Sequence, residues 1–392
     1  MSLKSSALIV ALSLLFFLIT ATSFASLGVL LPAMIAEFQW NWTTAGLGFT
    51  VLALATGLFS PIAASALERL GARSLYAGGG GVMALGFGLM AATTGVASYL
   101  AAAALIGAGF ALLANVAGTY LVGRAASQSR RNLLIGVYLA AGGAGGVFGP
   151  LLANAGADDW RTYWALAAAA VALVALCVAL LAGDARGASA QAPSTAETDA
   201  AWRPRAAMGT PAFAVIALAL TVAYFCGVTV STFSVAHLQK LEHPPAFAVG
   251  MLSLYAFANA FSRAAGGLAV KAVSAKFLLI AALLGNVAGM VALAFAATRE
   301  SAIAFAIFDG FAFGMALFAT TALIIEYFGL KNSPALLGAV NLAATAAMAG
   351  PTLAGWAADR TGGFAPVFLV YAGAALISAI AVAMMKRPPA PQ

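Results

Sequence analysis

The chain has 392 residues, of which 63% are hydrophobic and only 8% are charged. Soluble domains carry about 25% charged residues, so this composition excludes a soluble protein and predicts a polytopic membrane protein. The net charge of +7 does not indicate a nucleic-acid partner, because the basic residues lie in short clusters at the ends of apolar segments.

Twelve apolar segments are long enough to cross a bilayer, which requires about 20 residues. The first apolar run is longer than that of a signal peptide, so we expect it to remain as the first helix. Cutting the chain at its charges and at Gly, Pro and Asn predicts a first set at 7–31, 44–66, 74–93, 98–122, 133–155 and 160–182. The second set is predicted at 212–236, 246–270, 276–297, 301–325, 334–356 and 364–385.

The two sets are separated by one long polar stretch rich in Ala, Ser, Thr and Pro, a composition that cannot form a packed core. The expected domains are a six-helix bundle over 1–183, a flexible linker over 184–211 and a second six-helix bundle over 212–392. GPLLANAGADDWR at 149–161 aligns with GPTLAGWAADRTG at 350–362, which indicates a duplicated unit. The predicted fold class is an all-α membrane protein with twelve transmembrane helices in two pseudo-symmetric bundles.

The basic residues predict an orientation. With twelve helices, 14 of the 19 Lys and Arg residues fall on the side of the linker and both termini. Since short cytoplasmic loops are enriched in Lys and Arg, we expect both termini and the linker to be cytoplasmic, in a multi-pass protein of the plasma or inner membrane.

Arg263 is the one basic residue that the sequence places inside an apolar segment, in FAVGMLSLYAFANAFSRAAGGLAVK. A guanidinium stays charged, so it needs a polar cavity or a carboxylate. A structural Arg paired with an acid and an anion-binding residue of a transport pathway are both open, and intramembrane ionisable residues favour the second. Asn259, one helical turn earlier, could donate a hydrogen bond to the same ligand.

Asp309 is the second charge within a span and the leading candidate for a proton carrier; the alternative is a structural counter-ion to Arg263. His237 and His243 are expected to be surface histidines. The spans contain no Ser/His/Asp set, metal cluster or nucleotide loop, so neither an enzyme nor a cofactor is expected. Further hydroxyl and amide groups that could contact a bound anion are Tyr120, Asn115, Tyr138, Tyr224 and Asn341.

Two motifs resemble those of the major facilitator superfamily. SALERLGARS at 65–74 resembles its cytoplasmic signature, with Glu68 where Asp is usual and Ser65 where Gly is usual. Glycines and a proline in the fifth segment resemble a motif associated with exchangers, with Ala153 replacing the last Gly. The resemblance implies conformational roles for Glu68, Arg69, Gly71, Arg73, Gly145, Gly149 and Pro150, with the acid and bases of the signature forming a clamp between helices.

Within the superfamily, the stretches 129–150, 259–269 and 324–364 resemble the monocarboxylate-transporter and oxalate/formate-antiporter group. This resemblance implies that Arg263 binds a substrate carboxylate. The eleventh segment lacks a second cation and the first lacks the lysine of some members, which argues against a dicarboxylate.

The implied function is secondary active transport of a small organic monocarboxylate by alternating access, in a monomer, coupled to H⁺ symport or anion exchange. A proton-coupled exporter of drugs or other small solutes is one alternative. A non-transporting receptor or an intramembrane enzyme is an alternative of another class.

Overall fold

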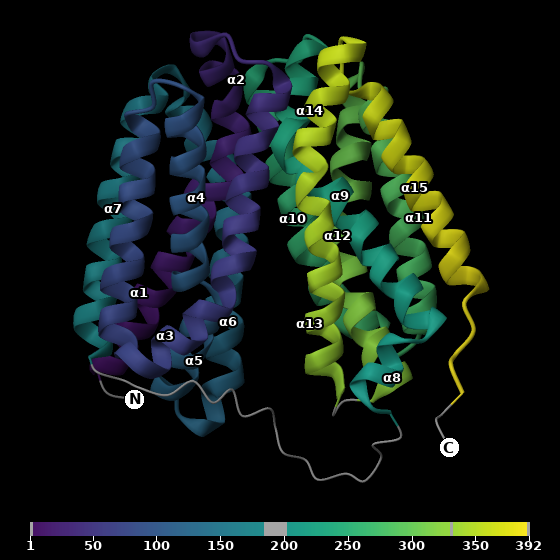
Figure 1. Cartoon of the computed structure of the whole chain (residues 1–392), viewed down its shortest axis with the longest axis horizontal. Coiled ribbons are helices and arrows are strands. Elements are labelled where there is room, and N and C mark those ends of the chain that lie inside the picture. Colours follow the sequence, from purple (N-terminus) through teal and green to yellow (C-terminus); the bar gives the residue numbers. More distant parts are fainter. Residues whose placement is uncertain (1–2, 184–201, 330–331, 390–392) are drawn as a thin grey trace. The chain divides into compact units, whose positions relative to one another are not determined.

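The computed structural model describes residues 3–183, 202–329 and 332–389, which form helices and no strand (Figure 1). Twelve helical segments in these ranges are long and apolar enough to cross a membrane. The predicted all-α fold with twelve spanning helices is therefore confirmed. The chain divides into two compact units, Met1–Ala192 and Pro193–Gln392, with six of the spanning segments in each.

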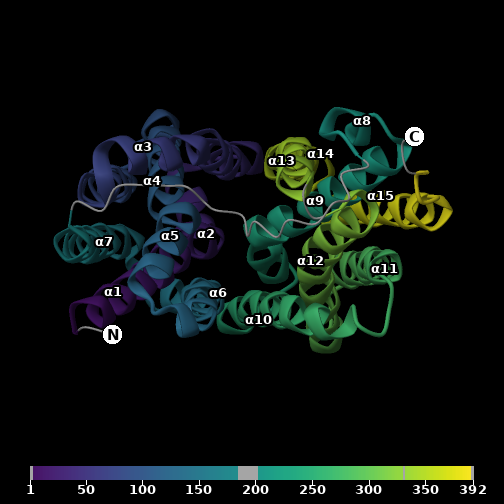
Figure 2. The same cartoon turned by 90° about the horizontal axis from the view of Figure 1, so that it is seen from below.

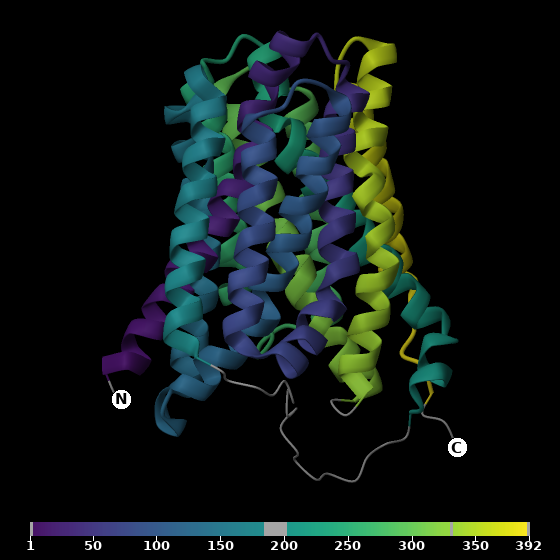
Figure 3. The ribbon, with the colours of Figure 1, turned by 60° about the vertical axis from the view of Figure 1, so that its left-hand side comes forward.

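In the N-terminal unit, several spans differ from ideal helices. The first span is helical throughout, but a π-helix separates its two α-helical parts. The second and third spans are the two parts of one long helix that turns sharply between them. Figure 3 shows the start of the first helix (purple) slanting away from its neighbours. The elements are α1 (Leu3–Thr20), the π-helix η1 (Ala21–Ala25), α2 (Ser26–Phe38), α3 (Trp42–Ala91), α4 (Val96–Leu113), α5 (Asn115–Ala125), η2 (Gln128–Arg130), α6 (Arg131–Ala155), η3 (Ala157–Asp159) and α7 (Trp160–Ala182).

The turn within α3 is made at Gly71, with φ 80° and ψ 167°. This is a backbone conformation that side chains with a Cβ rarely adopt, whereas Gly adopts it at little cost. Helical structure continues on both sides of Gly71. The glycine of the SALERLGARS segment therefore has a backbone role, because it lets the chain reverse between two spans without a long loop.

In the C-terminal unit, the eleventh span is interrupted by a 3₁₀ segment, and the other five spans are single helices. Figure 2 shows α11, α12 and α15 as neighbours, and their Ala and Leu side chains build the core together with those of α9. The elements are α8 (Pro204–Met208), α9 (Pro211–Lys240), α10 (Pro245–Ala269), α11 (Ala275–Ala294), α12 (Arg299–Phe328), α13 (Ser333–Ala344), η5 (Thr345–Ala349), α14 (Gly350–Thr361) and α15 (Ala365–Met384).

The predicted linker is ordered at its end. Residues 184–201 lie outside the described residues, but Trp202 packs edge-on against Phe328 with ring centroids 5.4 Å apart. Asn332 Nδ2 donates to the Trp202 carbonyl at 2.7 Å, and Thr210 caps α9. The part of the predicted linker from Trp202 onward is therefore anchored to the C-terminal unit, because the indole of Trp202 packs on an apolar side chain.

Candidate functional site

Arg263 lies on α10, and its Nε donates to Asn259 Oδ1 at 3.1 Å. Its side chain is exposed, and no acid in the described part of the chain pairs with it. The donors on Nη1 and Nη2 have no partner among those residues. Arg263 is therefore a charged group whose terminal edge is free to bind an anion.

Arg263 lies within the spanning helix α10, as the sequence predicts. It lies six residues before the end of α10 at Ala269, about 9 Å along the helix axis, which is midway between the centre of the helix and its end on the linker side. An Arg at this depth can turn its charge towards the near end of the span. The hydrogen bond to Asn259 shows that the Arg263 side chain points towards the centre of the span instead, because Asn259 lies one turn nearer that centre.

Two glycines of α12 bring that helix against the candidate site. A Cβ at Gly314 would collide with Ser262 Oγ and the Asn259 carbonyl oxygen, and one at Gly310 would collide with the Tyr255 carbonyl oxygen. Small residues four apart allow such close approach between membrane helices. The backbone that carries Asn259 is therefore packed directly on α12.

Two tyrosines lie near the guanidinium. Tyr224 of α9, a predicted candidate, is half-buried, and its ring packs edge-on against Phe313 at 5.5 Å. Tyr255 of α10, which the sequence analysis missed, is buried, and its hydroxyl has no hydrogen-bond partner among the described residues. Both phenols are close enough to Arg263 to interact with it electrostatically. The structure thus brings Arg263, Asn259 and Tyr224 together and adds Tyr255.

Asp309 is fully buried on α12 and does not pair with Arg263, so the predicted alternative of a structural counter-ion is wrong. Instead Asn286 Nδ2 of α11 donates to Asp309 Oδ1 at 2.6 Å. Asp309 Oδ2 and Asn286 Oδ1 have no hydrogen-bond partner in the described part of the chain. Gly289 permits this contact, because a Cβ there would collide with Asp309.

Asn286 was missed by the sequence analysis, although a signal for it exists. It is the amide within GNVAG at 285–289, and both glycines of this segment face α12. A glycine pair spaced by four residues marks a close helix contact, and a polar residue between them is a candidate for a hydrogen bond across that contact. The acid on the opposite helix can be identified only from the packing.

Four further residues were predicted to contact a bound anion: Tyr138, Asn341, Tyr120 and Asn115. Tyr138 is buried in the N-terminal unit, where its hydroxyl donates to the Ala114 carbonyl at 3.1 Å and its ring stacks on Phe16 at 4.8 Å. That hydroxyl has a structural partner, so the prediction of a substrate contact is not supported. Asn341 Nδ2 donates to the Leu337 carbonyl of its own helix at 2.8 Å. Tyr120 is half-buried, and the Asn115 side chain lies outside the description.

The expectation that both histidines lie at the surface is wrong. His237 Nε2 donates to the Leu293 carbonyl at 2.9 Å, and His243 Nε2 donates to the Ala296 carbonyl at 2.7 Å. Both rings are buried. Leu293 is at the end of α11 and Ala296 just follows it, where a helix leaves carbonyl groups without intrahelical partners; the Leu293 carbonyl also accepts from the Ala296 N–H at 3.2 Å.

No ion pair forms the expected clamp at the SALERLGARS segment within the described part of the chain. The side chains of Glu68, Arg69 and Arg73 are exposed, and Glu68 has no ion-pair partner there. The contact that Arg73 makes is through its backbone, whose N–H donates to the Gly183 carbonyl at 3.1 Å.

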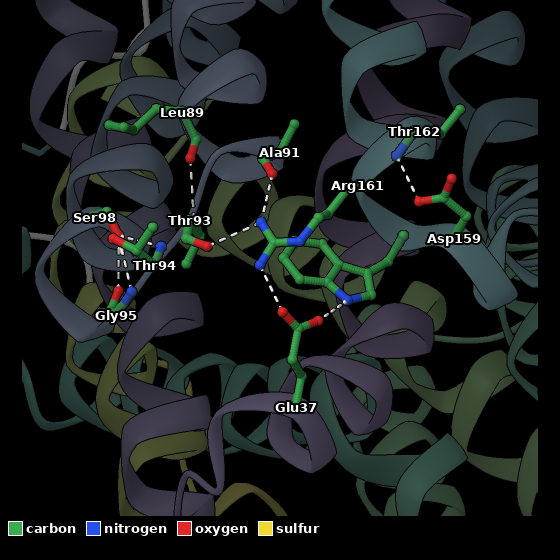
Figure 4. Close-up of polar contacts among 11 residues, drawn as sticks. Glu37, Leu89, Ala91, Thr93, Thr94, Gly95, Ser98, Asp159, Arg161 and Thr162 are labelled. Carbon is green, nitrogen blue, oxygen red and sulfur yellow. Dashed lines mark hydrogen bonds and ion pairs between the residues drawn. The ribbon is translucent and has the colours of Figure 1, made fainter.

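An ion pair in the described part of the N-terminal unit joins Arg161 and Glu37, which the sequence analysis did not single out (Figure 4). Arg161 Nη2 is 2.6 Å from Glu37 Oε1, and Nη1 donates to the carbonyls of Ala91 at 2.8 Å and Thr93 at 3.0 Å. Trp160 Nε1 donates to Glu37 Oε2 at 3.0 Å. These contacts tie the end of α2 to the end of α3 and the start of α7.

The glycine–proline segment of α6 packs against the first span. A Cβ at Gly145 would collide with the Phe17 carbonyl oxygen, and one at Gly149 would come within 2.6 Å of the Ala21 carbonyl oxygen. Pro150 continues α6 directly after Gly149. The segment of the first span opposite Gly149 is the π-helix η1, a form that often marks functional positions.

Comparisons with known proteins identify relatives of this fold. The Major Facilitator Superfamily profile matches residues 12–304. No curated protein matches the chain by sequence. A bacterial homolog of the human lysosomal transporter Spinster aligns with a TM-score of 0.73 and 16% identity, covering 98% of this chain and 96% of that one.

Two further solved structures align over nearly the whole chain. A mutant of the nucleoside transporter NupG has a TM-score of 0.80 and 14% identity, with 97% of this chain and 100% of that one covered. A D-xylose–proton symporter has a TM-score of 0.72 and 18% identity, with 98% of each chain covered. At these identities the likeness shows a shared fold.

Proposed function

The chain belongs to the Major Facilitator Superfamily, and from this premise we propose that it transports a small organic anion with one carboxylate, coupled to H⁺ or to a counter-anion. Transporters of this superfamily hold substrate between two related halves near mid-membrane and expose the site alternately to each side.

The observation that carries the proposal is the free terminal edge of the Arg263 guanidinium. Asn259 accepts from Nε, and no acid in the described chain pairs with the guanidinium. A guanidinium cannot lose its proton, and an unpaired charge within a membrane is costly. An incoming carboxylate would accept two parallel hydrogen bonds from Nη1 and Nη2.

The neighbouring groups favour an anion with a further polar oxygen. Asn259 Oδ1 is occupied by Arg263, so its Nδ2 remains available to donate. The hydroxyl of Tyr224 lies on a different helix near the same charge. Together these groups suit a small carboxylate that carries a hydroxyl or keto oxygen, such as lactate or pyruvate.

The charge balance favours one carboxylate. Arg263 is the single Lys or Arg that the sequence places inside a span away from its end clusters. A second carboxylate would find no other Lys or Arg inside a span to pair with. The free-energy cost of burying an unpaired carboxylate is far larger than the stabilisation from a hydrogen bond.

Asp309 and Asn286 support coupling to a proton. Asp309 Oδ2 and Asn286 Oδ1 are acceptor oxygens without a hydrogen-bond partner among the described residues. A proton on Asp309 would give this buried pair of side chains a further donor. Asp309 and Gly314 lie on the same helix, and Gly314 packs on the backbone of Asn259. A shift of Asn259 on substrate binding would therefore be transmitted to the helix that carries Asp309.

Anion exchange is the second candidate, favoured by the packing of Gly145 and Gly149 against the first span. In this scheme the contact between α6 and the first span supports a conformational change that takes place only with an anion bound, both inward and outward. Asp309 then has a structural role. A proton gradient would then leave net uptake unchanged.

The experiment is uptake into proteoliposomes of labelled lactate, pyruvate, formate, oxalate and glycolate, with and without an imposed pH gradient. We expect saturable uptake of a monocarboxylate, with weak competition from oxalate and none from xylose or a nucleoside. If xylose or a nucleoside competes as well as any carboxylate, the proposal is refuted. Dependence of accumulation on the pH gradient distinguishes symport from exchange.

A further inference from the structure

A cavity of about 450 Å³ lies at the linker end of the C-terminal unit, where α9 begins and α15 ends. Its volume is within the roughly 300–1,000 Å³ of small-molecule sites. Figure 2 shows α8 and the C-terminal segment on this side of the unit. The lining is mainly apolar and includes Trp202, Thr210, Val215, Met384, Lys386 and Arg387.

The walls of this cavity are held by defined contacts. Trp202 packs against Phe328, and its carbonyl accepts from Asn332. Lys276 Nζ donates to the carbonyls of Ala383 at 2.8 Å and Met385 at 2.7 Å, which holds the end of α15. The cavity is therefore a built feature of the fold and does not depend on a single surface side chain.

The charged side chains that line the cavity are both basic. Lys386 and Arg387 line the cavity, and neither forms an ion pair in the described part of the chain. Arg203, Arg205 and Lys276 lie at the same end of the unit, as does the exposed Glu326, whose backbone carbonyl accepts from Arg387 Nη2 at 3.1 Å. An apolar cavity with a basic mouth suits a molecule with an apolar chain and a negatively charged head.

We infer that this cavity binds an anionic phospholipid, with an acyl chain against Trp202, Val215 and Met384 and the phosphate beside Lys386 and Arg387. The cavity lies at the ends of spanning helices, where lipid headgroups meet the protein. Basic pockets between helices at this level recognise anionic headgroups, and a Trp beside them is typical of the membrane boundary. The inference stands apart from the substrate that the protein transports.

The test is lipid retention by the full-length protein in native mass spectrometry, comparing phosphatidylglycerol with phosphatidylcholine of the same acyl chains. We expect preferential retention of phosphatidylglycerol. At roughly fivefold per cation, the double variant Lys386→Gln/Arg387→Gln should bind it roughly 25-fold more weakly. Because Arg387 also contacts α12, Lys386→Gln alone is measured too and should weaken binding roughly fivefold.

Two further variants separate a site from general attraction. Lys240→Gln/Arg299→Gln removes the same charge at the other end of the unit and should retain phosphatidylglycerol like the parent. Val215→Trp fills the cavity, keeps every charge and should lower retention. Equal retention of both lipids by the parent, or parent-like retention by the double variant or by Val215→Trp, would overturn the inference.

Discussion

Replacing Arg263 with glutamine should remove anion binding while leaving the protein folded. Within the described chain, the change breaks one hydrogen bond, Nε to Asn259 Oδ1. Such a bond contributes about 0.5–1.5 kcal/mol, so the apparent Tm should fall by only a few degrees. A bound carboxylate would lose two charge-assisted bonds of about 1.5–3 kcal/mol each, which predicts affinity at least ~100-fold weaker.

Arg263→Lys separates charge from geometry. Lysine keeps the positive charge but cannot present two parallel donors, so we expect affinity at least ~10-fold weaker and no further loss of stability. Binding is measured by scintillation proximity with labelled lactate or pyruvate, and stability by a thermal melt of the same purified protein.

Arg161→Gln is the matched control, because it removes a guanidinium that is already satisfied within the protein. Arg161 pairs with Glu37 and donates to two carbonyls of α3 and the following turn. This variant should therefore lower the Tm more than Arg263→Gln does and bind substrate like the parent. Parent-like binding by Arg263→Gln, or a drop in its Tm as large as that of Arg161→Gln, would refute the reasoning.

Three further predictions concern coupling, assembly and packing. Asp309→Asn should abolish accumulation driven by a pH gradient but retain counterflow exchange; accumulation that persists in proteoliposomes rules out Asp309 as the proton carrier. Co-expressed halves 1–190 and 200–392 should restore uptake, since each contains its own six spans, and correctly inserted halves that fail to associate would contradict this. Gly145→Val should lower the free energy of unfolding by about 1–3 kcal/mol, because the larger side chain pushes α6 away from the first span. Gly136→Val places its side chain in open space and should leave the stability unchanged. Equal melting temperatures of the two variants would contradict the packing.

Local features of the sequence were sufficient for the fold. Each span is a run of about 20 apolar residues bounded by charges, and this property does not depend on the rest of the chain. The unusual position of Arg263 and its relation to Asn259 also follow from one helix, because residues four apart share a face. The resemblance of the SALERLGARS segment agrees with the family to which the chain belongs.

The partners of the buried polar groups could not be predicted in this way. Asp309 and Asn286 come from different helices, as do His237 and the Leu293 carbonyl. Tyr138 was predicted to offer its hydroxyl to a bound anion, yet that hydroxyl donates to the Ala114 carbonyl at the break between α4 and α5.

The sequence by itself determined the number of spans, the two six-helix sets and the presence of an intramembrane cation that must be accommodated. The tertiary structure decided which polar groups face each other, which of them are already satisfied and where the cavity beside Lys386 lies. The physical reason is that lipid tails are as apolar as leucine side chains. The lipid-facing and protein-facing sides of a membrane helix therefore look alike in the sequence, and only the packing of the helices distinguishes them.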